Sequence, residues 1–149
     1  MKVIVDANIV FSAILNTNSK IADILFNSKG IIDFVAPDFL LTEISKYHRK
    51  ISLASKLPID EVLRVESKVI RPVQFISGYQ IPESIWIKSE QIVLDIDPKD
   101  TAYLAFSFYF KCKIWTGDKE LKAGLLRKGL KNVISTEELF QIREMRKYK

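Results

Sequence analysis

Four carboxylates occupy positions where an acid can take part in chemistry. Two follow apolar runs that are typical of buried strands: Asp6 ends VIVD, and Asp118 stands two residues past KIWT. Asp100 precedes the apolar stretch TAYLAFSFYF, and Glu43 lies beside the apolar stripe of a helix expected over 38–50. A carboxylate that ends a buried strand with no adjacent cation needs a partner from elsewhere in the chain. The partner that neutralises these acids therefore decides what they do.

A divalent cation is the partner that fits four such acids if they converge on one rim of the fold. Clustered carboxylates repel one another and raise one another's pKa unless a cation neutralises them. An all-oxygen set without histidine or cysteine suits Mg²⁺ or Mn²⁺ better than zinc. The amide of Asn8 and the hydroxyl of Thr116 are placed to support Asp6 or a water on the ion. The sequence therefore predicts an acidic metal site.

Ordinary structural explanations exist for most of these residues. Asp100 and Asp118 each stand directly before a helical pattern, where an acid commonly caps the first turn. Glu43, taken alone, is equally well explained as the edge of a helix. His48, in the basic segment KYHRK, is expected to be solvated or to stabilise a helix end. Cys112 has no cysteine partner and is expected to be a small, partly buried hydrophobe.

Alternating strand and helix patterns determine where these side chains lie. Short β-branched runs predict strands, and apolar residues spaced at i, i+3 and i+4 predict helices. The expected strands cover 2–6, 32–36, 113–116 and 132–135, and the expected helices cover 20–28, 38–50, 60–70, 83–94, 101–110, 118–129 and 136–148. Residues 71–82 are expected to be an irregular connection, and Thr136 is the expected cap of the last helix.

Strands that alternate with helices are typical of a parallel sheet with helices on both faces, so the predicted fold is a three-layer α/β/α domain. In such a sheet, ligands bind beyond the carboxyl ends of the strands. Asp6 and Asp118 both lie at such ends. The chain has 149 residues, of which 48% are hydrophobic, and we expect one domain over 1–149.

The charge distribution bears on partners and location. Residues 101–149 carry 11 basic and 5 acidic side chains, whereas residues 1–100 carry 12 and 13. This basic excess suits a partner made of phosphates, with Lys128 and Lys131 as expected contacts, although a solvated terminal helix explains it equally well. No apolar stretch approaches the roughly 20 residues of a membrane-spanning helix, and the N-terminus does not resemble a secretory signal. We therefore expect a cytoplasmic protein with no membrane partner.

Four separated segments resemble, in the correct order, the motifs of the PIN-domain family of nucleases, which includes the VapC-type toxins. They are VDANIVFSAIL, PDFLLTEI, DIDPKDTAYLAFS and WTGDKEL. The resemblance implies that the family's catalytic, metal-binding acids are Asp6, Glu43, Asp100 and Asp118, with Asn8 and Thr116 as supporting polar residues. Family members often carry a further aspartate where this chain has Glu120. Asp97, three residues before Asp100, is an additional candidate ligand.

The same resemblance implies a function. PIN-domain nucleases cut single-stranded or structured RNA by in-line attack of a water that Mg²⁺ or Mn²⁺ activates, and many are homodimeric toxins held in check by an antitoxin protein. Two alternatives stay open. One is a catalytically inactive PIN-fold protein that binds RNA or acts as a scaffold. The other is a haloacid-dehalogenase-type phosphatase, which needs a second aspartate where this chain has Asn8.

Overall fold

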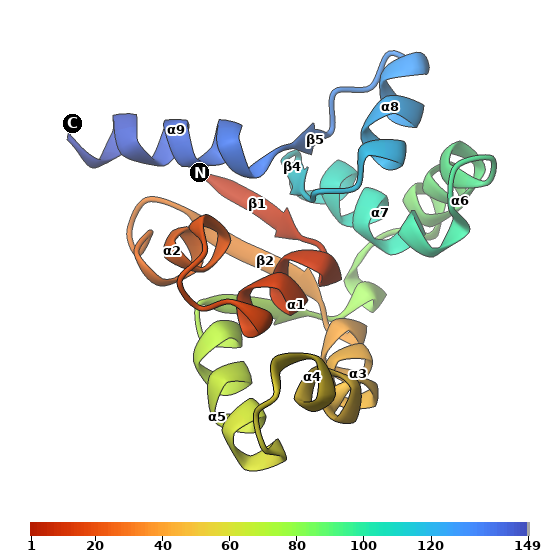
Figure 1. Ribbon diagram of the computed structural model, residues 1–149. Helices are drawn as coiled ribbons and strands as arrows, with labels where there is room; N and C mark the ends of the chain where they lie inside the picture. The colour runs from red at the N-terminus through yellow and green to blue at the C-terminus, as the bar shows by residue number, and fades with distance from the viewer. Residues whose placement is uncertain (149) are drawn as a thin grey trace.

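The computed structural model describes residues 1–148, within which five strands form one parallel sheet (Figure 1). The strands are β1 (Lys2–Val5), β2 (Asp33–Pro37), β3 (Val73–Ile76), β4 (Lys113–Trp115) and β5 (Val133–Ile134). Their order is β3-β2-β1-β4-β5, with β1 at the centre. Because every pairing is parallel, the carboxyl ends of all strands meet at one edge of the sheet. The predicted three-layer α/β/α fold is confirmed.

One face of the sheet packs against helices from the first half of the chain and from its end. These are α1 (Ala7–Leu15), α2 (Lys20–Phe26), α3 (Phe39–Lys46), α4 (His48–Ser55), α5 (Ile59–Ile70) and α9 (Thr136–Lys147). Successive strand residues alternate between the two faces, so Val3 and Val5 of β1 point to this side. Both are fully buried in a hydrophobic cluster with residues of these helices. In Figure 1, α3, α4 and α5 lie together below the sheet, and α9 runs along its upper side.

The opposite face packs against α6 (Glu83–Val93), α7 (Thr101–Phe110) and α8 (Lys119–Arg127). Here the intervening strand residues Ile4, Val35 and Ile114 form a second hydrophobic cluster with these helices. Residues 102–107 of α7 are all buried, which explains why that helix has no polar face. The 3₁₀ turns η1 (Gly78–Gln80) and η2 (Pro98–Asp100) lead into α6 and α7. The short turn η2 ends at Asp100, which therefore stands at the start of α7.

Helix α1 follows β1 directly and was not expected from the sequence. Residues 7–15 read ANIVFSAIL and are apolar almost throughout. The buried residues Ile9, Val10, Ala13 and Ile14 have helical spacing, but their neighbours are also apolar, so no helical pattern stands out in the sequence. Asp6 keeps an extended backbone (φ −77°, ψ 152°) and is the residue at which the strand changes into the helix. The charge that ends the strand is therefore held at a strand-to-helix turn.

The helix expected over 38–50 is two helices, α3 and α4, which divide at Tyr47. The break turns α4 so that Ile51 is buried and His48 reaches Glu66 of α5. The His48 side chain is 23% exposed and the Glu66 side chain 13%, so His48 is only partly solvated and packs against α5. Tertiary packing between α4 and α5 therefore overrides the continuous helical pattern.

Two further differences concern short elements. The segment 71–82, expected to be irregular, contains the edge strand β3, in which only Val73 is buried. An edge strand of four residues with mixed burial has no alternating pattern to identify it. The cap of α9 is Ser135 and not Thr136, because the Ser135 hydroxyl accepts from the backbone N–H of Glu138 in a capping box. The Thr136 hydroxyl instead accepts a hydrogen bond from Trp115 Nε1 at 3.0 Å.

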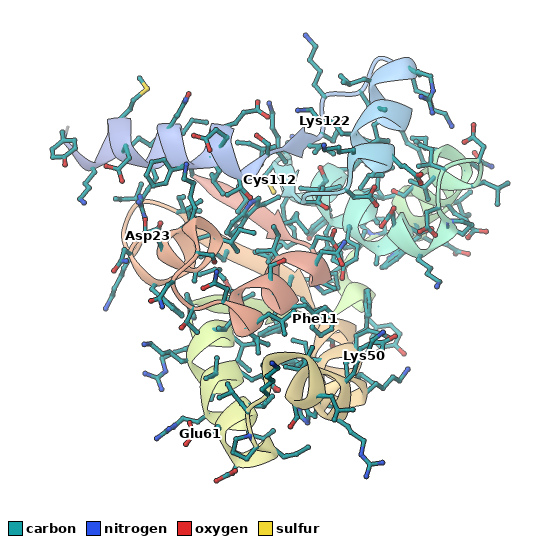
Figure 2. The ribbon with its side chains drawn as sticks, viewed as in Figure 1. Phe11, Asp23, Lys50, Glu61, Cys112 and Lys122 are labelled. Atoms are coloured by element: carbon teal, nitrogen blue, oxygen red, sulfur yellow. The ribbon has the colours of Figure 1, made fainter. Side chains whose placement is uncertain are left out.

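Cys112 is half-buried against the second hydrophobic cluster, and burial raises the pKa of its thiol to about 11 (Figure 2). The expectation of a partly buried hydrophobe is confirmed. Among residues 1–148, no single helix is long and apolar enough to cross a membrane. Helices α1 and α2 reach that length and composition only as a pair, and they are bent by 104° at their junction.

Candidate active site

The centre of the candidate site is the junction of β1 and β4 at the carboxyl edge of the sheet. Thr116 follows β4, and its Oγ1 donates a hydrogen bond of 2.5 Å to Asp6 Oδ2. The same Oγ1 accepts the backbone N–H of Asp118 at 3.0 Å. The Asp6 N–H donates to the carbonyl of Trp115 at 3.2 Å, so Asp6 belongs to the sheet by its backbone. Thr116 thus connects the two acids and holds Asp6 in one orientation.

Asp6 is 6% exposed, which is unusual for a carboxylate. Burial raises its pKa, the hydrogen bonds from Thr116 and the backbone of Ala7 oppose that rise, and the charge of Asp118 adds to it. The side chain is therefore both desolvated and repelled by a neighbouring acid, while hydrogen bonds from Thr116 and from the backbone of Ala7 and Asn8 keep it in place. This combination is typical of functional carboxylates, which burial and like charges shift away from their ordinary pKa.

Asp100 is the most perturbed acid of the site. It is 8% exposed, and its Oδ2 is buried without a hydrogen-bond partner. Burial raises the pKa of Asp100 to about 7, and the charges of Asp6, Asp97 and Asp118 contribute to that rise. The alternative explanation of this residue as a helix cap is wrong, because its side chain makes no capping hydrogen bond to α7. Asp100 is a buried acid that lacks a partner.

Asp118 is both the cap of α8 and a member of the acidic cluster. Its Oδ1 accepts the backbone N–H groups of Glu120 at 3.0 Å and Leu121 at 3.1 Å, so it caps α8. It also contributes to the raised pKa of both Asp6 and Asp100, which places its charge within reach of theirs. The explanation as a cap is therefore correct for Asp118, and the carboxylate belongs to the acidic cluster as well.

Glu43 and Asn8 lie at the margin of the cluster. Both line a groove of about 430 Å³ between α1, α3 and α4. Glu43 is half-buried and forms an ion pair of 3.5 Å with Lys46 on the same helix. The charge of Glu43 helps to raise the pKa of Tyr103. It does not contribute to the raised pKa of Asp6 or of Asp100. The structure thus brings Asp6, Asp100 and Asp118 together and places Glu43 on the adjoining wall.

Asp97 and Glu120, the two additional candidate ligands, differ in their position relative to the buried acids. Asp97 is half-buried, its Oδ1 accepts the backbone N–H of Lys99 at 3.0 Å, and its charge helps to raise the pKa of Asp100. Glu120 is exposed on α8 and contributes its backbone N–H to the Asp118 cap. Asp97 therefore supports the turn that presents Asp100, whereas the Glu120 side chain lies outside the buried cluster.

Tyr103 is a site residue that the sequence did not reveal. It is 4% exposed and packs edge-on against Phe39 at 5.7 Å between ring centroids. Burial raises the pKa of its hydroxyl far above the ordinary value, and the charges of Asp6, Asp100 and Glu43 add to this. The sequence signal is a phenol three residues after Asp100, one helical turn into a mostly apolar helix. Such a phenol stays protonated, so it presents a neutral polar group to the acids.

A cation fits this donor set by its chemistry. Within residues 1–148, no group of three or more histidine, cysteine, aspartate or glutamate side chains is arranged to hold a metal ion as it stands. The carboxylates would therefore have to turn toward an ion. The all-oxygen set, the buried and unpartnered Asp100 Oδ2 and the mutual repulsion of the acids are the features that a hard divalent cation relieves. Asp6, Asp100 and Asp118 are the residues that would hold it.

A comparison with family models bears on the class of this protein. The sequence matches the family model of the PIN domain over residues 4–139, which covers all the elements that carry the acids. A search of curated proteins gave no match. PIN domains are generally nucleases. The chain belongs to the PIN-domain family.

Proposed function

We propose that this protein is a divalent-metal-dependent endoribonuclease that hydrolyses RNA phosphodiester bonds. The observation that carries the proposal is Asp100, a buried carboxylate with an unpartnered oxygen and a pKa raised to about 7 beside two further acids. A buried acid without a partner destabilises the folded protein. Such acids are found mainly at functional sites, where their chemistry is needed. Membership of a family of nucleases supplies the class of reaction.

Each residue has a distinct part in this proposal. Asp6, Asp100 and Asp118 hold the cation, and Thr116 orients Asp6 by its hydrogen bond of 2.5 Å. Bound Mg²⁺ or Mn²⁺ supplies charge neutralisation at the scissile phosphate and activation of water. Tyr103 helps to exclude solvent from the site, because its ring is buried and packs against Phe39. The chain has no need of a protein nucleophile.

RNA as the substrate rests on the family likeness and on the net charge of +5. Lys128, one of the two lysines expected to contact RNA, has partners within the protein. The Lys128 ammonium donates to Asp95 Oδ1 at 2.5 Å and to the carbonyl of Ile92 at 2.6 Å, so it already has partners. It also lies beyond the end of α8, whereas Asp118 lies at the start of that helix. We therefore propose that the phosphate contacts nearest the scissile bond come from cations closer to the acids.

The role in the cell follows the family likeness alone. We propose that the protein is the toxin of a toxin–antitoxin pair, that an antitoxin protein suppresses it, and that it acts as a homodimer. Sedimentation of the purified chain, alone and with the product of a neighbouring gene, measures both associations.

Cleavage of labelled RNA tests the central proposal. The purified protein is expected to cut single-stranded RNA in Mg²⁺ or Mn²⁺ and to stop in EDTA. Asp6→Asn, Asp100→Asn and Asp118→Asn each remove a charged oxygen ligand and should reduce the rate by about 100-fold or more. Asp33→Asn is the matched control, because Asp33 is an exposed carboxylate at the amino end of β2, opposite the site. It should cleave like the wild type.

Two outcomes would contradict the proposal. Cleavage that persists in EDTA, or that survives the loss of Asp6, would identify a metal-independent activity. A folded wild type that binds RNA without cutting it in either metal would support the alternative of an inactive PIN-fold RNA-binding protein. Thermal unfolding of every variant shows whether a lost activity reflects the site or the fold.

A further inference from the structure

Two cavities of the surface lie at opposite ends of the sheet. The larger, about 570 Å³, lies at the amino ends of β2 and β3, away from the acids. The smaller, about 430 Å³, lies between α1, α3, α4 and η2 and shares Asn8 and Glu43 with the candidate active site. Its volume is within the roughly 300–1,000 Å³ of small-molecule sites. We therefore asked what the smaller groove, called here the α1–α4 groove, is shaped to hold.

The walls of the α1–α4 groove are aromatic and aliphatic. Phe11 of α1 and Tyr47 between α3 and α4 both line it, and their rings meet edge to face with centroids 5.5 Å apart. Tyr47 is 39% exposed, and Leu15 at the end of α1 is 47% exposed. Figure 2 labels Phe11 on α1 and Lys50 on α4, which come from the two sides of the groove. An exposed aromatic ring in a concave site is a surface on which a planar ring can stack.

Two cations border the same groove. The Lys50 ammonium lies 5.8 Å from the centroid of the Tyr47 ring. Lys99 stands one residue before Asp100, in the turn whose backbone Asp97 holds. Within residues 1–148, neither lysine forms an ion pair with an acidic side chain. The groove therefore joins an aromatic wall, two available cations and the edge of the acidic cluster.

From this juxtaposition we propose that the α1–α4 groove is a subsite for one unpaired nucleotide of single-stranded RNA next to the scissile phosphate. The inference rests on the proposed function and names its substrate class. Tyr47 stacks on the base, and Lys50 and Lys99 contact the phosphates on either side of it. Asn8 and Glu43 face the base edge with an amide and a carboxylate. A duplex cannot present a base in this way, because its bases are stacked and paired.

The groove favours a nucleotide over a protein segment. A stable protein interface needs about 800 Å² on each partner, and a cavity of about 430 Å³ accommodates a single planar group rather than a helix. Two cations against one carboxylate favour an anionic ligand with an aromatic part. A base between two phosphates has that composition.

Binding that requires no cleavage tests the subsite separately from the nuclease activity. The Asp6→Asn variant in EDTA is titrated with a fluorescent ten-nucleotide oligoadenylate and with a ten-unit abasic ribose-phosphate chain of equal charge. Stacking contributes about 1–3 kcal/mol for each base, so the oligoadenylate should bind about tenfold more tightly. Adding Tyr47→Ala should remove most of this preference, and Tyr47→Phe should retain it. Tyr109→Ala is the matched control, because Tyr109 is 36% exposed and meets Phe110 edge to face at the far end of α7.

Salt dependence tests the two lysines. Lys50→Ala and Lys99→Ala should each reduce the slope of log Kd against log salt by about 0.7, and Lys29→Ala, an exposed lysine at the opposite end of the sheet, should leave it unchanged.

The subsite is overturned if the abasic chain binds as tightly as the oligoadenylate, if Tyr47→Ala weakens both equally, or if duplex RNA of equal length binds as well. Any of these results would overturn the subsite even if the wild type cleaves RNA. The nuclease proposal would then hold without the subsite. Conversely, a base preference that depends on Tyr47 would establish the subsite in a protein that fails to cut. A folded Tyr47→Ala variant that keeps the full preference for the oligoadenylate would also overturn the subsite.

Discussion

Asp100 is the residue in which burial and charge conflict most strongly. Its pKa rises from an ordinary 3.8 to about 7 in the folded protein, chiefly because burial disfavours the charged form. The folded state therefore binds a proton more tightly than the unfolded chain does. The contribution of Asp100 to stability is most favourable when both states are protonated, below about pH 4, and becomes less favourable as the pH rises to about 7. Above that pH, the full cost of a charged Asp100 is present.

Replacing Asp100 with asparagine tests this cost. Asp100→Asn should leave the metal-free protein more stable than the wild type at pH 8, by about 1–3 kcal/mol, and nearly equal to it at pH 4. Urea unfolding across this range measures the difference. Asp33→Asn should show no such pH-dependent gain, because Asp33 is exposed. A variant that is less stable than the wild type at pH 8 would mean that Asp100 has a protein partner.

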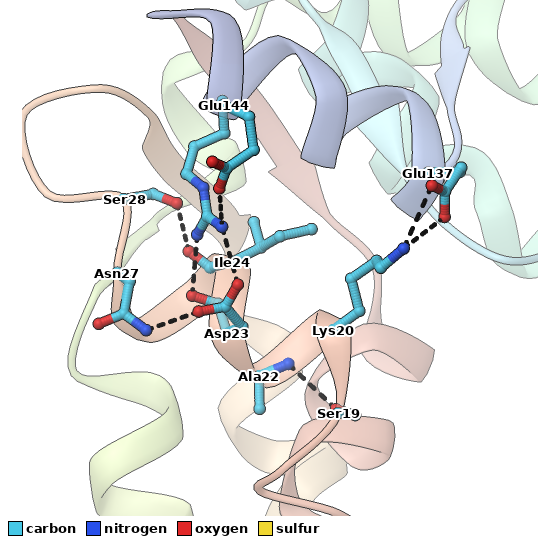
Figure 3. A network of polar contacts seen from close by, with 10 residues as sticks. Ser19, Lys20, Ala22, Asp23, Ile24, Asn27, Ser28, Glu137 and Glu144 are labelled. Carbon is cyan, nitrogen blue, oxygen red and sulfur yellow. Dashed lines mark hydrogen bonds and ion pairs between the residues drawn. The ribbon is translucent and has the colours of Figure 1, made fainter. Parts of the chain in front are cut away.

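At the scale of elements, α9 is attached to α2 by a buried cation. The Arg143 side chain of α9 is 3% exposed, and its Nη2 lies 2.7 Å from Asp23 Oδ2 of α2. Its Nη1 also donates to the Asp23 carbonyl at 3.2 Å. Figure 3 shows Asp23, Asn27 and Glu144 gathered around this contact, and the exposed pair of Lys20 and Glu137 one turn away. The two pairs connect the same elements with very different solvent exposure.

Removing one side chain from each pair should therefore lower the free energy of unfolding by different amounts. Arg143→Ala removes a buried group with several hydrogen bonds and should lower the free energy of unfolding by about 2–4 kcal/mol. Glu137→Ala removes one end of an exposed pair and should cost about 0.5 kcal/mol or less. Arg143 lowers the pKa of Asp23, so the contribution of the pair is present above about pH 4 and is lost as the pH falls further. Equal costs for the two variants in thermal unfolding would refute this distinction.

At the scale of the whole molecule, folding and metal binding are linked. A cation that binds the folded acids and not the unfolded chain stabilises by about 2.7 kcal/mol at a concentration 100 times its Kd. For a chain of this size, that corresponds to a rise in Tm of roughly 5–10 °C. Because Asp100 must lose its proton to bind the ion, the rise should be larger at pH 8 than at pH 6.

Differential scanning fluorimetry with Mg²⁺ and with Mn²⁺ at the two pH values measures this linkage. Asp6→Asn should remove the metal response, and Asp33→Asn should keep it. A rise in Tm that is independent of pH would mean that Asp100 does not bind the ion. A rise that persists in Asp6→Asn would mean that Asp6 does not bind it.

Much of the fold and part of the site were predictable from local pattern. The strands around Val3, Ile114 and Val133 and the buried helix after Asp100 have compositions that suit only one environment. Other elements were not predictable, for identifiable reasons. Helix α1 lacks a polar face, and Tyr47 divides one continuous helical pattern into two. Whether Asp100 or Asp118 is a cap depends on where each carboxylate points, and local sequence does not contain that direction.

The sequence by itself determined most of the alternation of strands and helices, although not α1, β3 or the division between α3 and α4. It also determined the positions of Asp6 and Asp118 at strand ends and the all-oxygen character of the candidate ligands. These follow from residue type and from spacing along one element, which are local properties. Only the tertiary structure decided that Thr116 connects Asp6 to Asp118, that Asp100 is buried without a partner, that Tyr103 faces the acids and that Tyr47, Lys50 and Lys99 share a groove. Those relations join residues of different elements, and only the packing of helices against the sheet sets the distances and the burial on which they depend.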